Sequence, residues 1–111
     1  MDCIFCKLID GSIPTEKVYE DGQVFAFKDL DPQAPIHYLF VPKKHIASLN
    51  EVDDFSIVSS IYSAIQKIAK KEAFDQKGYR VIVNCGEDGG QSVGHLHFHV
   101  MAGRPMTWPA G

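Results

Sequence analysis

Histidine alternates with an apolar residue in the stretch His95-Leu96-His97-Phe98-His99-Val100-Met101. Because successive side chains of a β-strand point to opposite faces, this alternation predicts a strand over residues 95–101. The three imidazoles then share one face, about 6–7 Å apart along the strand. Leu96, Phe98 and Val100 share the other face, where they can pack under a helix. The stretch therefore predicts a sheet with one apolar face and one face that carries chemistry.

Four more strands are predicted from short apolar runs bounded by turn residues. Two of them form a hairpin around the turn Glu20-Asp21-Gly22-Gln23, and Pro42 ends the third. The loop Asp31-Pro32-Gln33-Ala34-Pro35 is predicted to be extended, because proline restricts its own backbone and that of the preceding residue. The predicted strands are Lys17–Tyr19, Val24–Lys28, His37–Val41 and Tyr79–Asn84.

The clearest helix is predicted between Asp53 and Ala73. Its apolar residues recur at three- and four-residue spacing, which forms one stripe. Asp53 and Asp54 stand where an N-cap is wanted, and lysines stand near the end, where cations suit the helix dipole. A short helix is predicted over Ile4–Asp10. The order of elements predicts an α+β fold: an antiparallel sheet of about five strands, one long helix and a short N-terminal helix.

The composition narrows the class of protein. The 111 residues fit a single domain, 1–111, and 45% hydrophobic residues can bury an ordinary core. A net charge of -3 argues against nucleic-acid binding, which normally needs a basic face, but it allows a small phosphorylated ligand. No apolar run approaches the about 20 residues of a membrane span, and no signal-peptide pattern is visible. With three cysteines, an odd number, a cytoplasmic protein is expected.

Three interpretations of the histidine row are open from the residues alone. The histidines can be structural side chains, zinc ligands, or a nucleophile with its neighbours. A neutral imidazole attacks phosphorus well near pH 7. The preceding segment Gly89-Gly90-Gln91-Ser92-Val93-Gly94 favours the nucleophile, because glycines let the backbone approach a phosphate and Gln91 and Ser92 add donors. By itself, a glycine-rich segment is more often a plain turn.

Cys3 and Cys6 form a Cys-x-x-Cys pair near the N-terminus. Such a pair can be redox-active, half of a zinc site, or two buried thiols. A redox pair usually lies in a thioredoxin-like βαβ context, which the predicted element order lacks. No role is expected for Cys85 beyond that of a small residue.

The segment from Gly89 to Val100 resembles the signature of the histidine triad (HIT) family. Other pieces match in the same order: Phe5 between the two cysteines, residues 27–35, Pro42-Lys43-Lys44-His45 and Val83-Asn84. The tail Trp108-Pro109-Ala110-Gly111 is similar to the histidine triad nucleotide-binding (Hint) branch. The resemblance covers nearly the whole chain. One departure is Gly94, where related proteins often carry a bulkier residue, and it bears on the leaving-group contacts.

The resemblance implies a homodimer that binds purine nucleoside monophosphates and hydrolyses nucleoside 5′-phosphoramidates, with no cofactor required for catalysis. His97 would attack the α-phosphorus, and water would then release the nucleoside monophosphate from the nucleotidyl-histidine. His99 would donate to a phosphate oxygen, and Ser92 and Gln91 would lie beside the phosphate and the leaving amine. His37 would be an accessory partner of the triad. The predicted dimer interface is the long helix and the strand 79–84.

The resemblance also implies a nucleotide pocket. Asp29 would accept hydrogen bonds from the ribose hydroxyls, because an ionised carboxylate only accepts. An aromatic and aliphatic slot would hold the base and tolerate different purines. The alternatives are a turn residue for Asp29 and ordinary core for the slot. The implied nucleotide-binding residues are Phe5, Leu8, Phe27, Asp29, Leu30, Asn84, Gly90, Gln91, Ser92, His97, Phe98 and His99.

Some bacterial-type members of the family carry the cysteine pair with zinc. There the remaining ligands match His45 and His95, which implies a closed, structural Cys3, Cys6, His45 and His95 site. Two other functions stay open. One is a dimeric nucleotide-binding scaffold with incidental turnover. The other is a zinc–water hydrolase with His95, His97 and His99 as ligands, although no carboxylate base is evident beside them.

Overall fold

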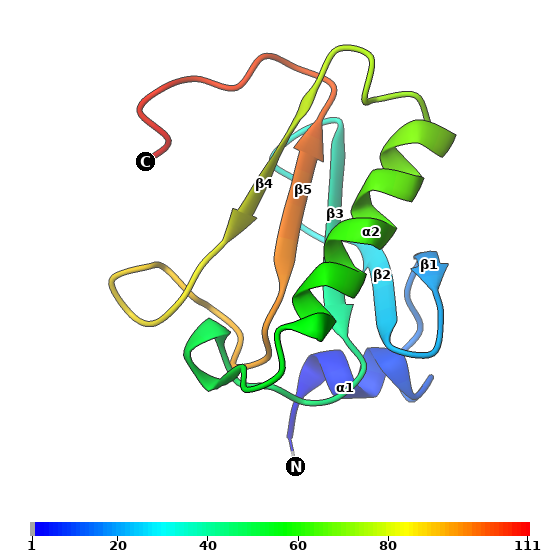
Figure 1. Cartoon of the computed structure of the whole chain (residues 1–111), viewed down its shortest axis with the longest axis vertical. Coiled ribbons are helices and arrows are strands. Elements are labelled where there is room, and N and C mark those ends of the chain that lie inside the picture. The colour runs from blue at the N-terminus through cyan, green and yellow to red at the C-terminus, as the bar shows by residue number, and fades with distance from the viewer. Residues whose placement is uncertain (1) are drawn as a thin grey trace.

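A computed structural model of the chain describes residues 2–111. All five strands join one antiparallel sheet in the order β1-β2-β3-β5-β4. Helix α2 lies across one face of this sheet, and α1 lies near the lower end in the view of Figure 1. This arrangement confirms the predicted α+β fold. The elements are α1 (Ile4–Ile9), β1 (Lys17–Glu20), β2 (Val24–Lys28), β3 (Ile36–Pro42), the 3₁₀ helix η1 (Leu49–Glu51), α2 (Ser56–Lys71), β4 (Tyr79–Val83) and β5 (Phe98–Ala102).

Alternation along the central strands divides the core into two clusters. The larger cluster packs against α2 and holds every second residue of β2, β3 and β5, including Phe98 and Val100. The smaller cluster takes the intervening residues of β2 and β3, with Phe5 and Leu8 of α1. Opposite faces of the sheet therefore have different tasks: the α2 face is apolar core, and the α1 face carries the histidines.

Strand β5 begins at Phe98, so the predicted start at His95 is wrong. Its ladder with β3 ends at the pair Phe40–Phe98. Pro42 has no N–H to extend that ladder. The N–H of Leu96 instead donates to the carbonyl of Ile46 at 2.7 Å. The predicted alternation survives outside the strand, because Leu96 still packs in the α2 cluster.

Helix α2 is shorter than predicted, beginning at Ser56 and ending at Lys71. The N-cap residue is Phe55, which makes no side-chain cap hydrogen bond, so the prediction of an aspartate N-cap is wrong. Asp54 lies one residue earlier, where its carboxylate accepts the N–H of Ser56 at 3.0 Å. After the helix, Ala73 has a φ of 64°, which right-handed helix does not allow. No helix within residues 2–111 is long and apolar enough to cross a membrane.

Candidate active site and metal cluster

The ring of His97 has one nitrogen bonded and one nitrogen open. Its Nδ1 lies 2.7 Å from the carbonyl oxygen of His95. A carbonyl only accepts, so Nδ1 carries the proton and Nε2 of the neutral ring carries a lone pair. Nε2 has no hydrogen-bond partner among residues 2–111, where every buried side-chain nitrogen or oxygen has one. This Nε2 therefore reaches the surface, although the residue as a whole is only 3% exposed.

A chain of hydrogen bonds fixes the proton of the neighbouring ring, His99. The backbone N–H of Gln33 donates to Nδ1 of His37 at 3.0 Å, so the His37 proton is on Nε2. That Nε2 lies 2.9 Å from Nδ1 of His99, which therefore accepts. His99 then carries its own proton on Nε2, which is also open to solvent. The centroids of the His97 and His99 rings are 5.1 Å apart, so the ring with the open lone pair and the ring with the open N–H are neighbours.

Burial keeps the rings of this hydrogen-bond chain neutral. It lowers the pKa of His99 to about 4, and the neighbouring His97 and His37 act in the same direction. Burial also lowers the pKa of His37, although the carboxylates of Asp29 and Asp31 oppose it. Both rings are therefore uncharged at pH 7, which is the state that the hydrogen-bond chain requires.

Asp29 lies at the edge of the histidine pair. Its Oδ2 is 3.4 Å from Nε2 of His37, and its Oδ1 accepts the N–H of Asp31 at 2.9 Å. Its backbone N–H donates to the carbonyl of His37 at 3.0 Å. Only one of the roughly four acceptor positions of this carboxylate is used by a hydrogen bond, because the Nε2 proton of His37 goes to His99, and its side chain is 19% exposed. The structure therefore holds an anchored, acceptor-only group beside the histidines.

An aromatic wall borders His97 on the α1 side. The ring of Phe5 meets His97 edge-on, with centroids 5.2 Å apart and an interplanar angle of 85°. Phe27 meets Phe5 at 5.3 Å, and Leu8 is buried in the same cluster. Three of the predicted base-slot residues thus come together beside the nucleophile candidate. Leu30 does not join them and is 89% exposed.

The loop of residues 85–94 is held by side-chain hydrogen bonds. Gln91 donates from Nε2 to two backbone carbonyls and accepts one backbone N–H, at 2.8–3.0 Å. Asn84 donates to another carbonyl of the loop, at 2.7 Å. Both amide protons of Gln91 are therefore used, one on the carbonyl of Val93 in the loop and one on that of Ala47 outside it, whereas Ser92 is exposed. Gly90 has a φ of 77°, in the left-handed region that glycine favours.

Phe98 points away from the histidines. It is 1% exposed, and its ring lies 5.6 Å from that of Tyr62 in α2. It alternates with His97 and His99, so its side chain belongs to the opposite face of the sheet. The prediction that Phe98 lines the nucleotide pocket is therefore wrong for the side chain.

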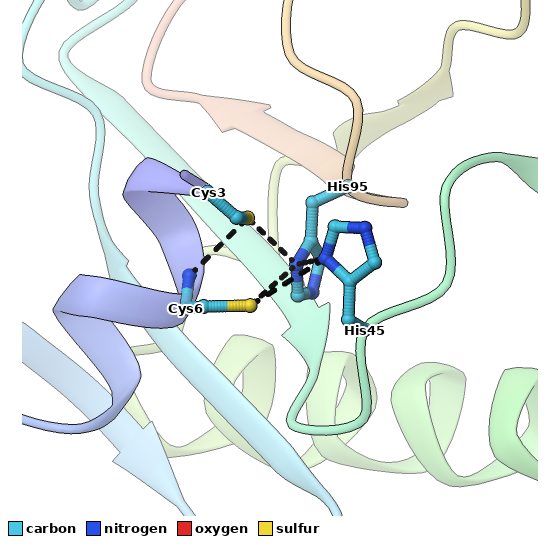
Figure 2. A group of neighbouring side chains, drawn as sticks. All are labelled: Cys3, Cys6, His45 and His95. Atoms are coloured by element: carbon cyan, nitrogen blue, oxygen red, sulfur yellow. Dashed lines mark hydrogen bonds between the residues drawn. The ribbon is translucent and has the colours of Figure 1, made fainter. Parts of the chain in front are cut away.

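A second group of side chains, the Cys–His cluster of Cys3, Cys6, His45 and His95, lies beside α1 (Figure 2). Nδ1 of His95 is 3.3 Å from Sγ of Cys3, 3.7 Å from Sγ of Cys6 and 3.2 Å from Nδ1 of His45. Sγ of Cys6 is 3.5 Å from Nδ1 of His45. Four potential ligand atoms, two nitrogens and two sulfurs, therefore converge on one point.

These separations fit a tetrahedral zinc ion. Zinc–nitrogen bonds of about 2.0–2.1 Å and zinc–sulfur bonds of about 2.3 Å put neighbouring ligand atoms about 3.3 Å (N–N) and about 3.6 Å (N–S) apart. Nε2 of His95 donates to the carbonyl of Pro42 at 2.8 Å, which leaves the lone pair on Nδ1, the atom that faces the cluster. Burial lowers the pKa of His95, so this ring is neutral, as a ligand must be. The cluster can hold a metal ion.

The zinc–water arrangement of His95, His97 and His99 does not form. Nδ1 of His95 faces the cysteines, whereas Nδ1 of His97 and of His99 bonds a carbonyl and His37 respectively. Asp29, His37 and His99 also lie within ligand distance of one another. In that group the 2.9 Å contact between the two imidazoles is a hydrogen bond, shorter than the about 3.3 Å of two nitrogens on one zinc.

Two backbone groups that fix histidine tautomers in the site were not predicted from the sequence. The carbonyl of Pro42 fixes the tautomer of His95, and the backbone N–H of Gln33 fixes that of His37. Both are main-chain groups of ordinary loop and strand-end residues. Side-chain chemistry carries no signal of such contacts, because every residue but proline offers the same two backbone groups.

Comparison with known proteins matches residues 10–106 to the HIT domain. Among solved structures, a histidine triad protein from Clostridium difficile is 58% identical, with a TM-score of 0.94 over 96% of this chain and 95% of that one. A HIT family hydrolase from Legionella pneumophila is 45% identical, with a TM-score of 0.95 over 99% and 100% of the two chains.

A more distant structure is that of a histidine triad nucleotide-binding protein from Candida albicans. It is 34% identical, with a TM-score of 0.85 over 99% of this chain and 85% of that one. The likeness therefore extends over the whole histidine site and the aromatic wall.

Proposed function

This chain belongs to the HIT domain family, and on that premise we propose that it is a nucleotide-binding hydrolase that cleaves the P–N bond of purine nucleoside 5′-phosphoramidates. The observation that carries the proposal is the open Nε2 of His97. Its lone pair is fixed by the bond from Nδ1 to the His95 carbonyl at 2.7 Å. A preset tautomer at a solvent-open nitrogen is what a nucleophilic imidazole needs.

The reaction proceeds in two displacements. Nε2 of His97 donates its lone pair to the α-phosphorus, the P–N bond breaks, and the amine leaves with a proton from solvent or a neighbouring donor. Water then attacks the same phosphorus and gives up a proton to solvent, which restores the proton taken by the amine. The P–Nε2 bond breaks, and the nucleoside monophosphate leaves as the ring recovers its lone pair. Splitting one displacement in this way lowers the barrier of each step.

The neighbouring groups supply charge and shape. His99 donates its Nε2 proton to a non-bridging phosphate oxygen, where charge builds in the transition state. Asp29 accepts from the ribose hydroxyls, and the wall of Phe5 and Phe27 meets the base. Ser92, exposed on the braced loop, contacts the phosphate or the leaving amine. The nucleotide-binding name of the Candida albicans relative and the hydrolase name of the Legionella pneumophila relative support this choice of chemistry.

We also propose that the Cys–His cluster holds zinc. With two thiolates and two imidazoles as ligands, the four-coordinate site is closed, so the ion supplies a cross-link between α1 and the histidine segment. Neutral His95 and the convergence of all four ligand atoms support this assignment.

A homodimer is the assembly that we propose. Within residues 2–111, β4 is an edge strand of the sheet, and a second copy of the chain can lie along its outer side. Tyr62 of α2 and Tyr79 of β4 are 46% and 37% exposed, and a partner would cover them. Light scattering of the purified protein tests this: a monomer at micromolar concentration contradicts it.

The test of the activity compares wild type with His97→Gln on adenosine 5′-phosphoramidate. We expect turnover to fall by about 10⁴-fold or more, as when a nucleophile is removed elsewhere. AMP binding and the melting temperature should stay close to wild type. A nucleotide labelled at the α-phosphorus should be trapped on wild type by rapid denaturation and not on the variant. Wild-type turnover by His97→Gln contradicts the proposal, and tight AMP binding with negligible wild-type turnover favours a nucleotide-binding scaffold.

A further inference from the structure

We propose that metal binding at the Cys–His cluster and nucleotide binding beside His97 are cooperative, with His95 and Phe5 as the two links between the sites. The inference rests on the proposed function, because it takes the pocket beside His97 as the nucleotide site. It assigns the cluster an effect on ligand affinity in addition to its effect on stability.

The first link is the backbone of His95. Its ring belongs to the cluster through Nδ1, and its carbonyl oxygen accepts the Nδ1 proton of His97 at 2.7 Å. His95 lies outside the β5 ladder, so the sheet does not fix this carbonyl. The ring contacts of His95 and the bond from the N–H of Leu96 to the next loop hold it instead. The nucleophile therefore takes its orientation from a residue that the cluster positions.

The second link is Phe5, which stands in the sequence between the two thiols. Its ring meets His95 at 5.8 Å and His97 at 5.2 Å, and both contacts are edge-on. The same ring meets Phe27 at 5.3 Å. One side chain thus contacts a cluster ligand, the nucleophile and the wall of the pocket.

The segment that carries Phe5 has little stability of its own. Helix α1 has six residues, and Sγ of Cys3 caps it by accepting the N–H of Cys6 at 3.4 Å. Isolated helices of this length do not persist in water. Ligation at Cys3 and Cys6 fixes both ends of the turn that presents Phe5. A nucleotide that packs on a wall already ordered loses less entropy on binding, which is positive cooperativity.

The larger hydrophobic core lies apart from the Cys–His cluster. The larger core against α2 contains none of Cys3, Cys6, His45 or His95. Metal-free protein should therefore keep the sheet and α2, which allows its nucleotide affinity to be measured.

The experiment is calorimetric titration of AMP into wild-type protein loaded with Zn²⁺ and stripped by a chelator, with the reciprocal titration of Zn²⁺ with and without saturating AMP. We expect AMP to bind about tenfold more tightly to the loaded protein, and Zn²⁺ to gain the same factor from AMP, because coupling between two sites is reciprocal. Far-ultraviolet circular dichroism of the stripped protein should remain close to that of the loaded form.

Phe5→Leu tests the link, and Phe25→Leu is its matched control. Phe25 lies with Phe5 in the smaller hydrophobic core, and its ring centroid is 6.0 Å from that of Phe27. Phe5→Leu should keep zinc and lose most of the coupling factor, whereas Phe25→Leu should retain it. Equal AMP affinity of loaded and stripped wild type overturns the cooperativity while leaving the proposed function intact. Absence of AMP binding and of hydrolysis in every metal state overturns both.

Discussion

The active site and the Cys–His cluster use neighbouring histidines of one segment for opposite purposes. In the cluster, Nδ1 of His95 faces another imidazole and two thiols, so four potential ligand atoms point at one another. In the active site, Nδ1 of His97 and of His99 each has one hydrogen-bond partner of fixed direction. The first arrangement can hold a cation at its centre, and the second leaves one open lone pair and one open N–H.

The difference comes from the partner of the second ring nitrogen. A carbonyl, that of Pro42, holds the proton of His95 on Nε2 and releases Nδ1 to the cluster. The carbonyl of His95 holds the proton of His97 on Nδ1 and releases Nε2 to solvent. Two residues apart, the same side chain is thus suited to the proposed ligand role or to the proposed nucleophile role, according to which nitrogen a backbone carbonyl occupies.

The largest difference between the two sites should appear when one histidine of each is replaced and the same three quantities are measured on both variants. His97→Gln should lower turnover by about 10⁴-fold or more while zinc content and melting temperature stay near wild type. His95→Gln should lose zinc and stability and keep measurable turnover. Zinc content by atomic emission, melting temperature and turnover are measured on both variants. Equal damage to all three quantities in both variants would show that the two sites are one.

Removal of the metal should give the next largest effect. A ligand present at 1,000 times its Kd stabilises the folded state by about 4 kcal/mol, which a chelator removes. For a domain of this size we expect the melting temperature to fall by well over ten degrees, at about 4–8 °C per kcal/mol.

Cys3→Ser with Cys6→Ser should reproduce the effect of the chelator and show no further response to it. Cys85→Ser is the matched control, because Cys85 lies outside the cluster. An unchanged melting curve in the presence of the chelator would contradict the proposal that zinc at the cluster stabilises the fold.

The partner of His99 should matter less than the nucleophile. His37→Phe removes the N–H that keeps the His99 proton on Nε2, so the donor to the phosphate is no longer preset. We expect kcat to fall by about tenfold to a hundredfold, less than the about 10²–10³ lost when a whole donor is deleted. Gln33→Ala is the control, because only its backbone N–H bonds His37. Steady-state kinetics distinguish the two, and an equal loss in both variants would contradict the proposed hydrogen-bond chain.

The two faces of the sheet were predictable from the residues. The end of the β5 ladder and the separation of the histidines into two sites were not, for a physical reason. Alternation placed Leu96, Phe98 and Val100 against the helix, because side-chain period depends only on an extended backbone. It did not show that the ladder stops at Phe98, since that depends on Pro42 in another strand. The cysteine pair and the histidines were candidate ligands by type. Their separation into two sites depends on carbonyls and N–H groups, which every residue shares.

The smallest effect should appear in the pH dependence of stability. Burial lowers the pKa of folded His99 to about 4, from an ordinary value of 6.5. Between these values the unfolded chain binds a proton that the folded ring refuses, so the free energy of unfolding falls as the pH falls from about 6.5 to about 4. The contribution of His99 is at most about 3.5 kcal/mol, at about 1.4 kcal/mol per unit of pKa. His37, whose pKa is also lowered, adds a term of the same sign.

His99→Asn should flatten this dependence and leave stability above pH 7 with little slope. Both proteins carry the same Cys–His cluster, so the loss of metal in acid cancels in the difference between them. Urea unfolding at several pH values from 4 to 7.5 measures it. If wild type and His99→Asn lose stability in parallel, His99 is not buried as a neutral ring. The contrast between a ligand imidazole and a hydrogen-bonded imidazole would then need another origin.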